Sequence, residues 1–154
     1  MGLLKINPRD IEQILMFYQS KTFKELQLIR PNWAYDINIK KAWYDFSEDY
    51  STFLVKPEEL ISNAEMNEVT TNFLFTGNSM NDTRIARILY RWENNEFVDP
   101  PRIDLSNGNS NKVSFSDGRH RSKLAYFLEY DYIPILIHKL DIDSIGKILK
   151  LRMP

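Results

Sequence analysis

The chain contains no cysteine among its 154 residues. The absence of a thiol excludes a disulfide framework, a thiolate metal site and a cysteine nucleophile. Only two histidines are present, which is too few for a histidine-rich metal site. A chain without cysteine fits a reducing compartment, and we expect a cytoplasmic protein.

Long apolar runs are also missing. No stretch of about 18 apolar residues occurs, so we expect no segment that spans a membrane and no membrane partner. The first twenty residues lack the uninterrupted apolar core of a signal peptide. The chain has no internal repeat and no low-complexity tract.

An excess of charge of one sign is absent as well, since 20 lysines and arginines face 21 acidic residues. Sequence-independent nucleic-acid binders are normally more basic, so we do not expect a nucleic-acid partner. The charge is uneven, however. Residues 36–68 hold eight acids against three bases, and residues 82–152 hold ten acids against twelve bases. This division is typical of a protein-binding face opposite an anion site, or of an ordinary solvated surface.

The chain is rich in apolar and aromatic residues, at 43% and 13%, which predicts a folded globular protein. Its length is sufficient for one domain with a buried core. Helical spacing predicts helices from Asn7 to about residue 20, over 56–62 with Pro57 in its first turn, over 81–94, over 119–129, and from Asp141 to the carboxyl end.

Alternating or continuous apolar patterns predict strands over 51–55, 68–79, 113–116 and 133–139. Residues 36–46 fit either a helix or a strand, and residues 97–112 have the composition of a loop. If the strands on either side of the 119–129 helix are parallel and share a sheet, a right-handed crossover joins them.

The predicted helix over 81–94 has an apolar face and a stripe of arginines. Arg84, Arg87 and Arg91 follow one another at helical spacing. We favour a solvated face that pairs with local acids over a binding role for this stripe.

The five residues from Asp117 to Arg121 lie between a predicted strand and a predicted helix. Gly118 allows a ligand to approach the backbone, and the helix after it offers unpaired N–H groups and a positive dipole end. Arg119 and Arg121 add fixed charge, and His120 can titrate near neutrality. These residues indicate a site for a phosphate or a carboxylate.

A structural interpretation of the same five residues is also open. In it Asp117 caps the helix, Gly118 makes the turn, and the arginines pair with nearby carboxylates. The acidic candidates for these pairs are Asp99, Asp104 and Glu129.

The segments "PPRIDL" and "VSFSDGRHRSKLAYFLEYDYIPILI" resemble the ParB/sulfiredoxin superfamily, and within it plasmid fertility inhibition factors. The resemblance implies an α/β (α+β) fold, with a small mixed sheet flanked by helices. It also implies that Gly118, His120 and Arg121 occupy the positions of a phosphate-binding loop, which Arg119 and Asp117 match less strictly.

The resemblance divides the single domain, residues 1–154, into three parts. Residues 1–96 are a variable amino-terminal part, 97–139 carry the superfamily motif, and 140–154 form a carboxyl-terminal helix. Sulfiredoxins need a cysteine in the loop, so sulfinic acid reduction is excluded. ParB partition proteins carry a further helix-turn-helix domain, for which the residues after 137 leave too little room.

The resemblance implies a small inhibitor, of bacterial mobile-element type, that acts by binding a protein partner. An immunity protein that neutralises a toxin of interbacterial competition is an alternative. The acidic segment of residues 36–68 supplies the candidate contacts for a basic partner. These partner-binding candidates are Asp45, Glu48, Asp49, Glu58 and Glu59.

A second alternative is an enzyme that binds a nucleotide with Mg²⁺ at the loop and hydrolyses the nucleotide or cuts DNA. Asp99, Asp104 and Asp117 would hold a metal only if the fold brings them together. We identify no catalytic residue and no metal ligand, and we expect a binding protein without a cofactor.

Overall fold

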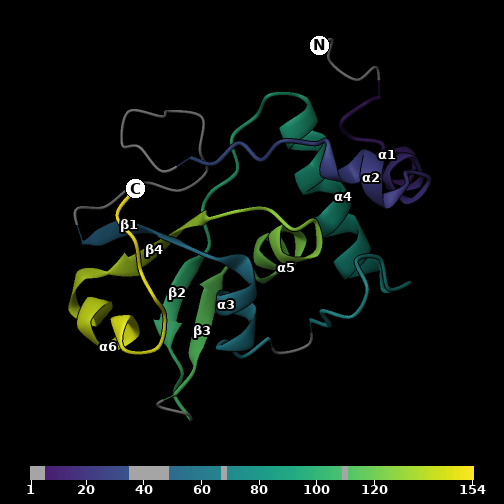
Figure 1. Ribbon diagram of the computed structural model, residues 1–154. Coiled ribbons are helices and arrows are strands. Elements are labelled where there is room, and N and C mark those ends of the chain that lie inside the picture. Colours follow the sequence, from purple (N-terminus) through teal and green to yellow (C-terminus); the bar gives the residue numbers. More distant parts are fainter. Residues whose placement is uncertain (1–5, 35–48, 67–68, 109–110) are drawn as a thin grey trace.

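A mixed sheet forms the centre of the chain in the computed structural model, which describes residues 6–34, 49–66, 69–108 and 111–154 (Figure 1). Its strands lie in the order β1-β4-β2-β3. β4 runs antiparallel to β1 and parallel to β2, and β2 runs antiparallel to β3. The strands are β1 (Tyr50–Val55), β2 (Arg102–Leu105), β3 (Val113–Asp117) and β4 (Ile133–His138).

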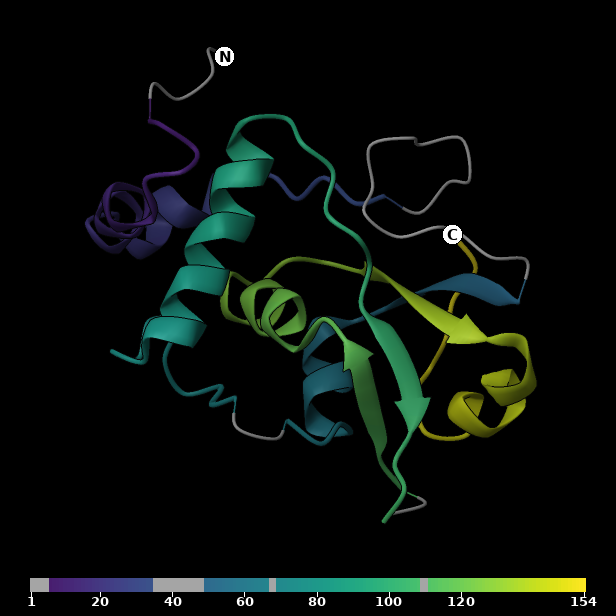
Figure 2. The same ribbon diagram turned by 180° about the vertical axis from the view of Figure 1, so that it is seen from behind.

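Helices cover the sheet and extend the fold away from it. Figures 1 and 2 show α5 between the sheet and α4, with α1 and α2 on the far side of α4. The described helices are α1 (Ile11–Gln19), α2 (Phe23–Gln27), α3 (Pro57–Ser62), α4 (Ser79–Glu93), α5 (Arg119–Phe127) and α6 (Ile142–Gly146), with a 3₁₀ turn η1 (Lys139–Asp141). The predicted α+β class, a mixed sheet flanked by helices, is confirmed.

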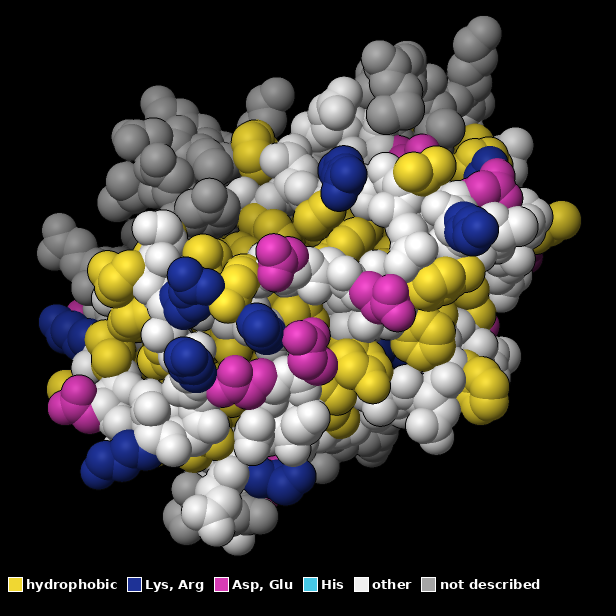
Figure 3. Space-filling view, in the orientation of Figure 1, with side chains coloured by type: hydrophobic (Ala, Val, Ile, Leu, Met, Phe, Trp, Pro, Cys, Tyr) yellow, Lys and Arg dark blue, Asp and Glu magenta, His cyan; other side chains and the backbone are white. Residues whose placement is uncertain are grey.

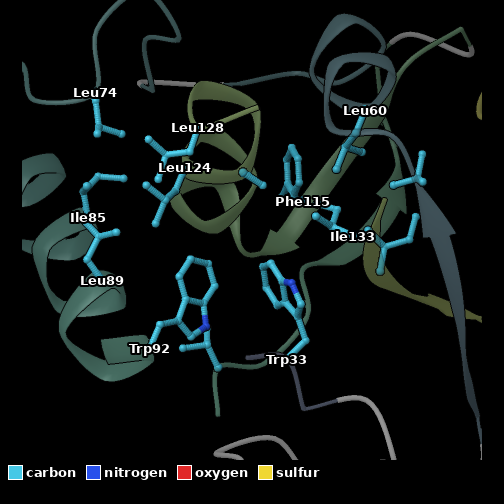
Figure 4. Close-up of a cluster of buried hydrophobic side chains, with 14 of the residues drawn as sticks. Trp33, Leu60, Leu74, Ile85, Leu89, Trp92, Phe115, Leu124, Leu128 and Ile133 are labelled. Atoms are coloured by element: carbon cyan, nitrogen blue, oxygen red, sulfur yellow. The ribbon is translucent and has the colours of Figure 1, made fainter. Parts of the chain in front are cut away.

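The core lies where α4, α5 and the sheet meet (Figure 4). This core includes Ile85 and Leu89 of α4 and Leu124 of α5, and all three side chains are fully buried. Trp92 meets Trp33 edge to face, with 5.2 Å between ring centroids. Burial of such large apolar side chains supplies most of the driving force for folding.

The predictions with strong periodicity are confirmed. The apolar run at 133–139 is the central strand β4, in which every residue from Ile133 to Ile137 is buried. The predicted strand at 51–55 is β1, and Pro57 occupies the first turn of α3. The region 36–46, which fits either a helix or a strand, lies outside the described residues.

Two helix boundaries differ from the prediction. α1 begins three residues later than expected, because Asn7 makes a local turn and the Asp10 side chain accepts the capping bond from the Gln13 N–H. The carboxyl-terminal helix is shorter and ends at Gly146. The chain after α6 pairs instead with β1, where Arg152 and Leu54 exchange two backbone hydrogen bonds.

The strand predicted over 68–79 is wrong for the residues that the structure describes there, 69–79. The backbone N–H groups of Thr76 and Gly77 donate to the carboxylate of Asp82, at 2.8 and 3.0 Å. Those donors are therefore unavailable for a strand ladder, and the segment forms a bent loop that leads into α4.

The loop predicted over 97–112 is partly wrong, since it contains β2. Ile103 is fully buried between β4 and β3, so two short neighbours stabilise a segment whose composition favours a loop. β2 also separates β3 from β4 and makes those two antiparallel to one another. The condition for a parallel crossover between them is not met.

Candidate functional site at the amino end of α5

Gly118 connects β3 to α5 in a backbone conformation that suits glycine. It has a φ of +104° and occupies the N-cap position of α5. A β-carbon on this residue would lie 2.6 Å from the α-carbon of Pro101. Both the left-handed conformation and the close approach of two backbones require glycine, so the fold itself accounts for Gly118.

Arg121 and Asp117 hold this loop in place. The Arg121 guanidinium lies 2.6 Å from the Asp117 carboxylate and also donates to the backbone carbonyl of Asp99 at 2.6 Å. The structural interpretation therefore holds for Arg121, although Asp117 supplies the carboxylate. The turn at Gly118 is confirmed, but the predicted cap is wrong, because the Asp117 side chain makes no capping hydrogen bond to α5.

Arg119 lies on the first turn of α5 and has unused hydrogen-bonding capacity. Its Nη2 donates to the carbonyl of Phe115 at 3.2 Å. Its Nε is buried and has no hydrogen-bond partner among the residues that the structure describes. A buried donor without a partner is costly to the fold, which makes this end of α5 receptive to an acceptor group.

His120 is half-buried and is surrounded by cations. Burial lowers the pKa of His120, and the charges of Arg84, Lys123, Arg119 and Arg121 lower it further, to about 4. The imidazole is therefore neutral near pH 7. Of the four cations, Arg121 pairs with Asp117 and Lys123 lies near Asp82, whereas Arg84 and Arg119 form no ion pair within the described residues.

Arg84 reaches this site from α4, 36 positions earlier in the sequence than His120. Among the cations, its charge has the largest effect on the pKa of His120. Arg84 is exposed and has no hydrogen-bond or ion-pair partner within the described residues. The sequence predicted a solvated stripe for Arg84 and did not indicate that Arg84 lies near His120.

A buried polar cluster lies beneath the site and was also missed. Lys123 is fully buried, and its Nζ donates to Asn81 Oδ1 at 2.8 Å. Burial lowers the pKa of Lys123 to about 8, although the charge of Asp82 opposes the shift. Asp82 is buried too, and it accepts from Asn81 Nδ2 at 2.8 Å. Helical spacing was the signal in the sequence for the burial of Lys123. Lys123 lies four residues before Phe127, which was predicted to face inward, so the two side chains share a face of the helix.

The charges at the ends of α5 are arranged against its dipole. The helix has no acidic residue in its first turn and no basic residue in its last. Cations instead gather at its positive amino end, and Glu129 and Asp131 follow its negative carboxyl end. A helix is stabilised by the opposite arrangement, so the helix dipole does not account for either group of charges.

The predicted partner-binding acids do not form one patch. Asp49 precedes β1 and pairs with Lys139 at 3.2 Å, whereas Glu58 and Glu59 follow the other end of that strand in α3. Six residues of strand separate the two groups by roughly 20 Å. Glu59 accepts a hydrogen bond from the backbone of Lys150, and Glu58 is exposed. Asp45 and Glu48 lie outside the described residues.

The three aspartates named as conditional metal ligands have other contacts. Asp117 pairs with Arg121, and Asp104 accepts a hydrogen bond from the Ser116 hydroxyl. In the described ranges, no group of three histidine or acidic side chains is arranged to hold a metal ion. The same residues contain no helix with the length and apolar character needed to cross a bilayer.

Comparison of the chain with protein-family models, with curated proteins and with solved structures gave no match. The relation to the ParB/sulfiredoxin superfamily stays a prediction that rests on the motif residues 98–137.

Proposed function

We propose that the amino end of α5 binds a phosphate group, and that the ligand is a nucleotide. The observation that carries this proposal is a pair of arginines at this end of the helix, Arg84 and Arg119, which form no ion pair within the described residues. Both charges act on the neighbouring His120 imidazole. The resemblance to phosphate-loop proteins supports the choice of ligand class.

Three features of this end of α5 favour an anion. The first N–H groups of the helix have no side-chain cap and point along the positive end of its dipole. Arg119, on the first turn of the helix, adds a guanidinium charge that no ion pair neutralises within the described residues. The exposed Arg84 supplies a guanidinium that can form two parallel hydrogen bonds to a phosphate.

The proposal concerns binding. A nucleotide hydrolase or a nuclease would need groups that activate water or hold a metal, and no such set has been identified here from the sequence or at the site. Lys123 contributes through its charge, because its side chain is fully buried.

Calorimetric titration with ATP and with CTP, with and without Mg²⁺, tests the proposal. Arg84→Ala is the informative variant, because Arg84 is exposed and its removal should leave the fold intact. Loss of one charge-assisted hydrogen bond should weaken binding by about tenfold or more. Arg87→Ala, one turn further along the same exposed face, is the matched control and should bind as the wild type does.

Arg121 is unsuitable for this test, because it also holds Asp117 and the carbonyl of Asp99. Equal affinities of the Arg84 and Arg87 variants would contradict the assignment of the site. The absence of heat with either nucleotide, in either metal condition, would contradict the nucleotide as ligand.

As a second function we propose that the chain is an inhibitor that binds a protein partner. The partner is a component of conjugative transfer machinery or, for an immunity protein, a toxin. The observation that favours this function is a groove with an acidic lining at the other end of α5, which includes Glu58, Glu129 and Asp131. Protein interfaces with such charge attract basic partners and accelerate their association at low salt.

A further inference from the structure

The groove at the carboxyl end of α5 has a volume of about 780 Å³. We call it the α5 groove. Its lining includes three carboxylates and three aromatic side chains, and among the described residues it includes no lysine or arginine. The residues concerned are Glu58, Glu129 and Asp131, with Tyr126, Phe127 and Tyr130. In Figure 3, acidic and apolar side chains lie side by side over α3 and α5.

The carboxylates of the α5 groove are not neutralised by the protein. Glu58, Glu129 and Asp131 are all exposed, and none forms an ion pair with a lysine or arginine of the described residues. The charge of Arg30 reaches Tyr130, but Arg30 does not pair with any of the three acids. The groove therefore keeps a net negative potential.

The fold places Glu129 against two of its own preferences. α5 ends with the N–H groups of Glu129 and Tyr130 donating to the carbonyls of Tyr126 and Ala125, a pattern in which glycine is favoured at the left-handed position. Glu129 occupies that position with a φ of +59°. Its carboxylate also adds negative charge to the negative end of the helix. Helix stability would favour glycine here, and the contact that the structure gives this carboxylate is a long hydrogen bond from Gln27 Nε2, at 3.4 Å, which leaves its charge unpaired.

The aromatic side chains give the α5 groove walls that suit a cationic side chain. Tyr126 is 37% exposed, so part of its ring is available for a cation–π contact. Tyr130 is held in place, because its hydroxyl donates to the carbonyl of Ile29 at 2.6 Å. A guanidinium can stack on such a ring while it pairs with a neighbouring carboxylate.

We propose that the α5 groove binds an extended, arginine- or lysine-bearing segment of a protein partner. The proposal rests on the second function above, binding of a protein, and is independent of the phosphate site at the other end of the helix. The volume is within the range of sites that enclose several side chains of a peptide. Charge complementarity is the feature that selects this occupant.

The test uses the full chain and a short capped peptide of alternating arginine and glycine. A matched peptide with citrulline in place of arginine keeps the shape and removes the charge. Binding is followed by fluorescence anisotropy at low salt and located by amide chemical shifts in NMR. We expect the arginine peptide to bind, with shifts that centre on residues 126–131 and 58, and the citrulline peptide not to bind.

Glu129→Gly is the principal variant, since it removes the carboxylate and relieves the backbone conformation at the same time. Combined with Asp131→Asn, it should weaken binding of the arginine peptide by about tenfold or more. The double variant should unfold no more easily than the wild type, because glycine suits the left-handed position. Asp143→Asn removes one exposed acid on α6, so it is the matched control for Asp131→Asn alone and should leave the affinity unchanged.

Three outcomes would overturn the proposal. One is an unchanged affinity in the Glu129 and Asp131 variant, and another is a set of shifts centred outside the groove. The third is binding of spermine as tight as that of the arginine peptide, which would assign the groove to a small polycation. Failure of nucleotide binding bears only on the first function, so the two proposals fail separately.

Discussion

The α-carbon of Pro101 lies 2.6 Å from the point that a β-carbon on Gly118 would occupy. The glycine of the basic loop is thus required by the packing of two backbone segments, whatever the loop binds. This relationship separates what the loop does for the fold from what it offers to a ligand. Gly118, Asp117 and Arg121 serve the fold, whereas Arg84 and Arg119 carry charge that no ion pair neutralises within the described residues.

Gly118→Ala should therefore destabilise the protein strongly. The alanine would have to adopt a φ of +104° and displace Pro101, and we expect a loss of about 2–4 kcal/mol in the free energy of unfolding. Urea denaturation measures this change. Gly77→Ala is a matched control, because Gly77 also has a positive φ, of +84°, but has no atom within 4 Å of an added β-carbon, so the change should cost less. Equal losses in the two variants would show that contact with Pro101 is unimportant.

Asp82→Ala should also destabilise the protein, by about 3–5 kcal/mol, because it leaves buried groups without partners. The N–H groups of Thr76 and Gly77 would lose their acceptor, and the buried Lys123 would lose its counter-charge. Chemical denaturation at pH 7 measures the loss.

Adding Lys123→Met to Asp82→Ala should recover part of the loss, since it removes the uncompensated buried cation. A double-mutant cycle gives the coupling between the two sites. Strict additivity of the two changes would contradict an energetic link between Asp82 and Lys123.

The low pKa of His120 predicts a loss of stability in mild acid. Its pKa is about 4 in the folded protein, against an ordinary value of 6.5, so the unfolded chain binds more protons between these values. The contribution of His120 to the free energy of unfolding should fall as the pH is lowered from 6.5 to 4, by up to about 3 kcal/mol. It should then level off below pH 4.

Comparison with His120→Gln isolates this contribution from other titrating groups. As the pH falls from 6.5 to 4, the free energy of unfolding should decrease more for the wild type than for the variant. A difference that is constant from pH 7 to pH 4 would contradict the assigned environment of His120.

Local sequence patterns predicted the parts of the fold that depend on a segment's own periodicity. β4 was visible as a continuous apolar run, and α3 as a proline-initiated turn of helix. β2 was not visible, because its stability comes from β3 and β4 on either side of it. The strand predicted after residue 68 failed because Asp82, later in the chain, takes the backbone donors at Thr76 and Gly77.

The candidate site was predicted only in part for the same reason. The basic residues of the loop are adjacent in the sequence, so a pattern can reveal them. Arg84 comes to His120 from another helix, and Lys123 meets Asn81 across 42 positions. Periodicity assigned the arginines of α4 to one stripe, but it could not indicate that Arg84 lies near the basic residues at the amino end of α5.

The measurement that most directly tests the phosphate site is an NMR pH titration of the His120 imidazole, first without and then with saturating ATP at constant ionic strength. Our account predicts that His120 titrates near pH 4 in the free protein, and that the ligand raises its pKa by about one unit or more. The signals of His138, at the end of β4, provide an internal reference that should not respond to the ligand. A His120 pKa that is unchanged by the ligand, or one near 6.5 in the free protein, would contradict the account.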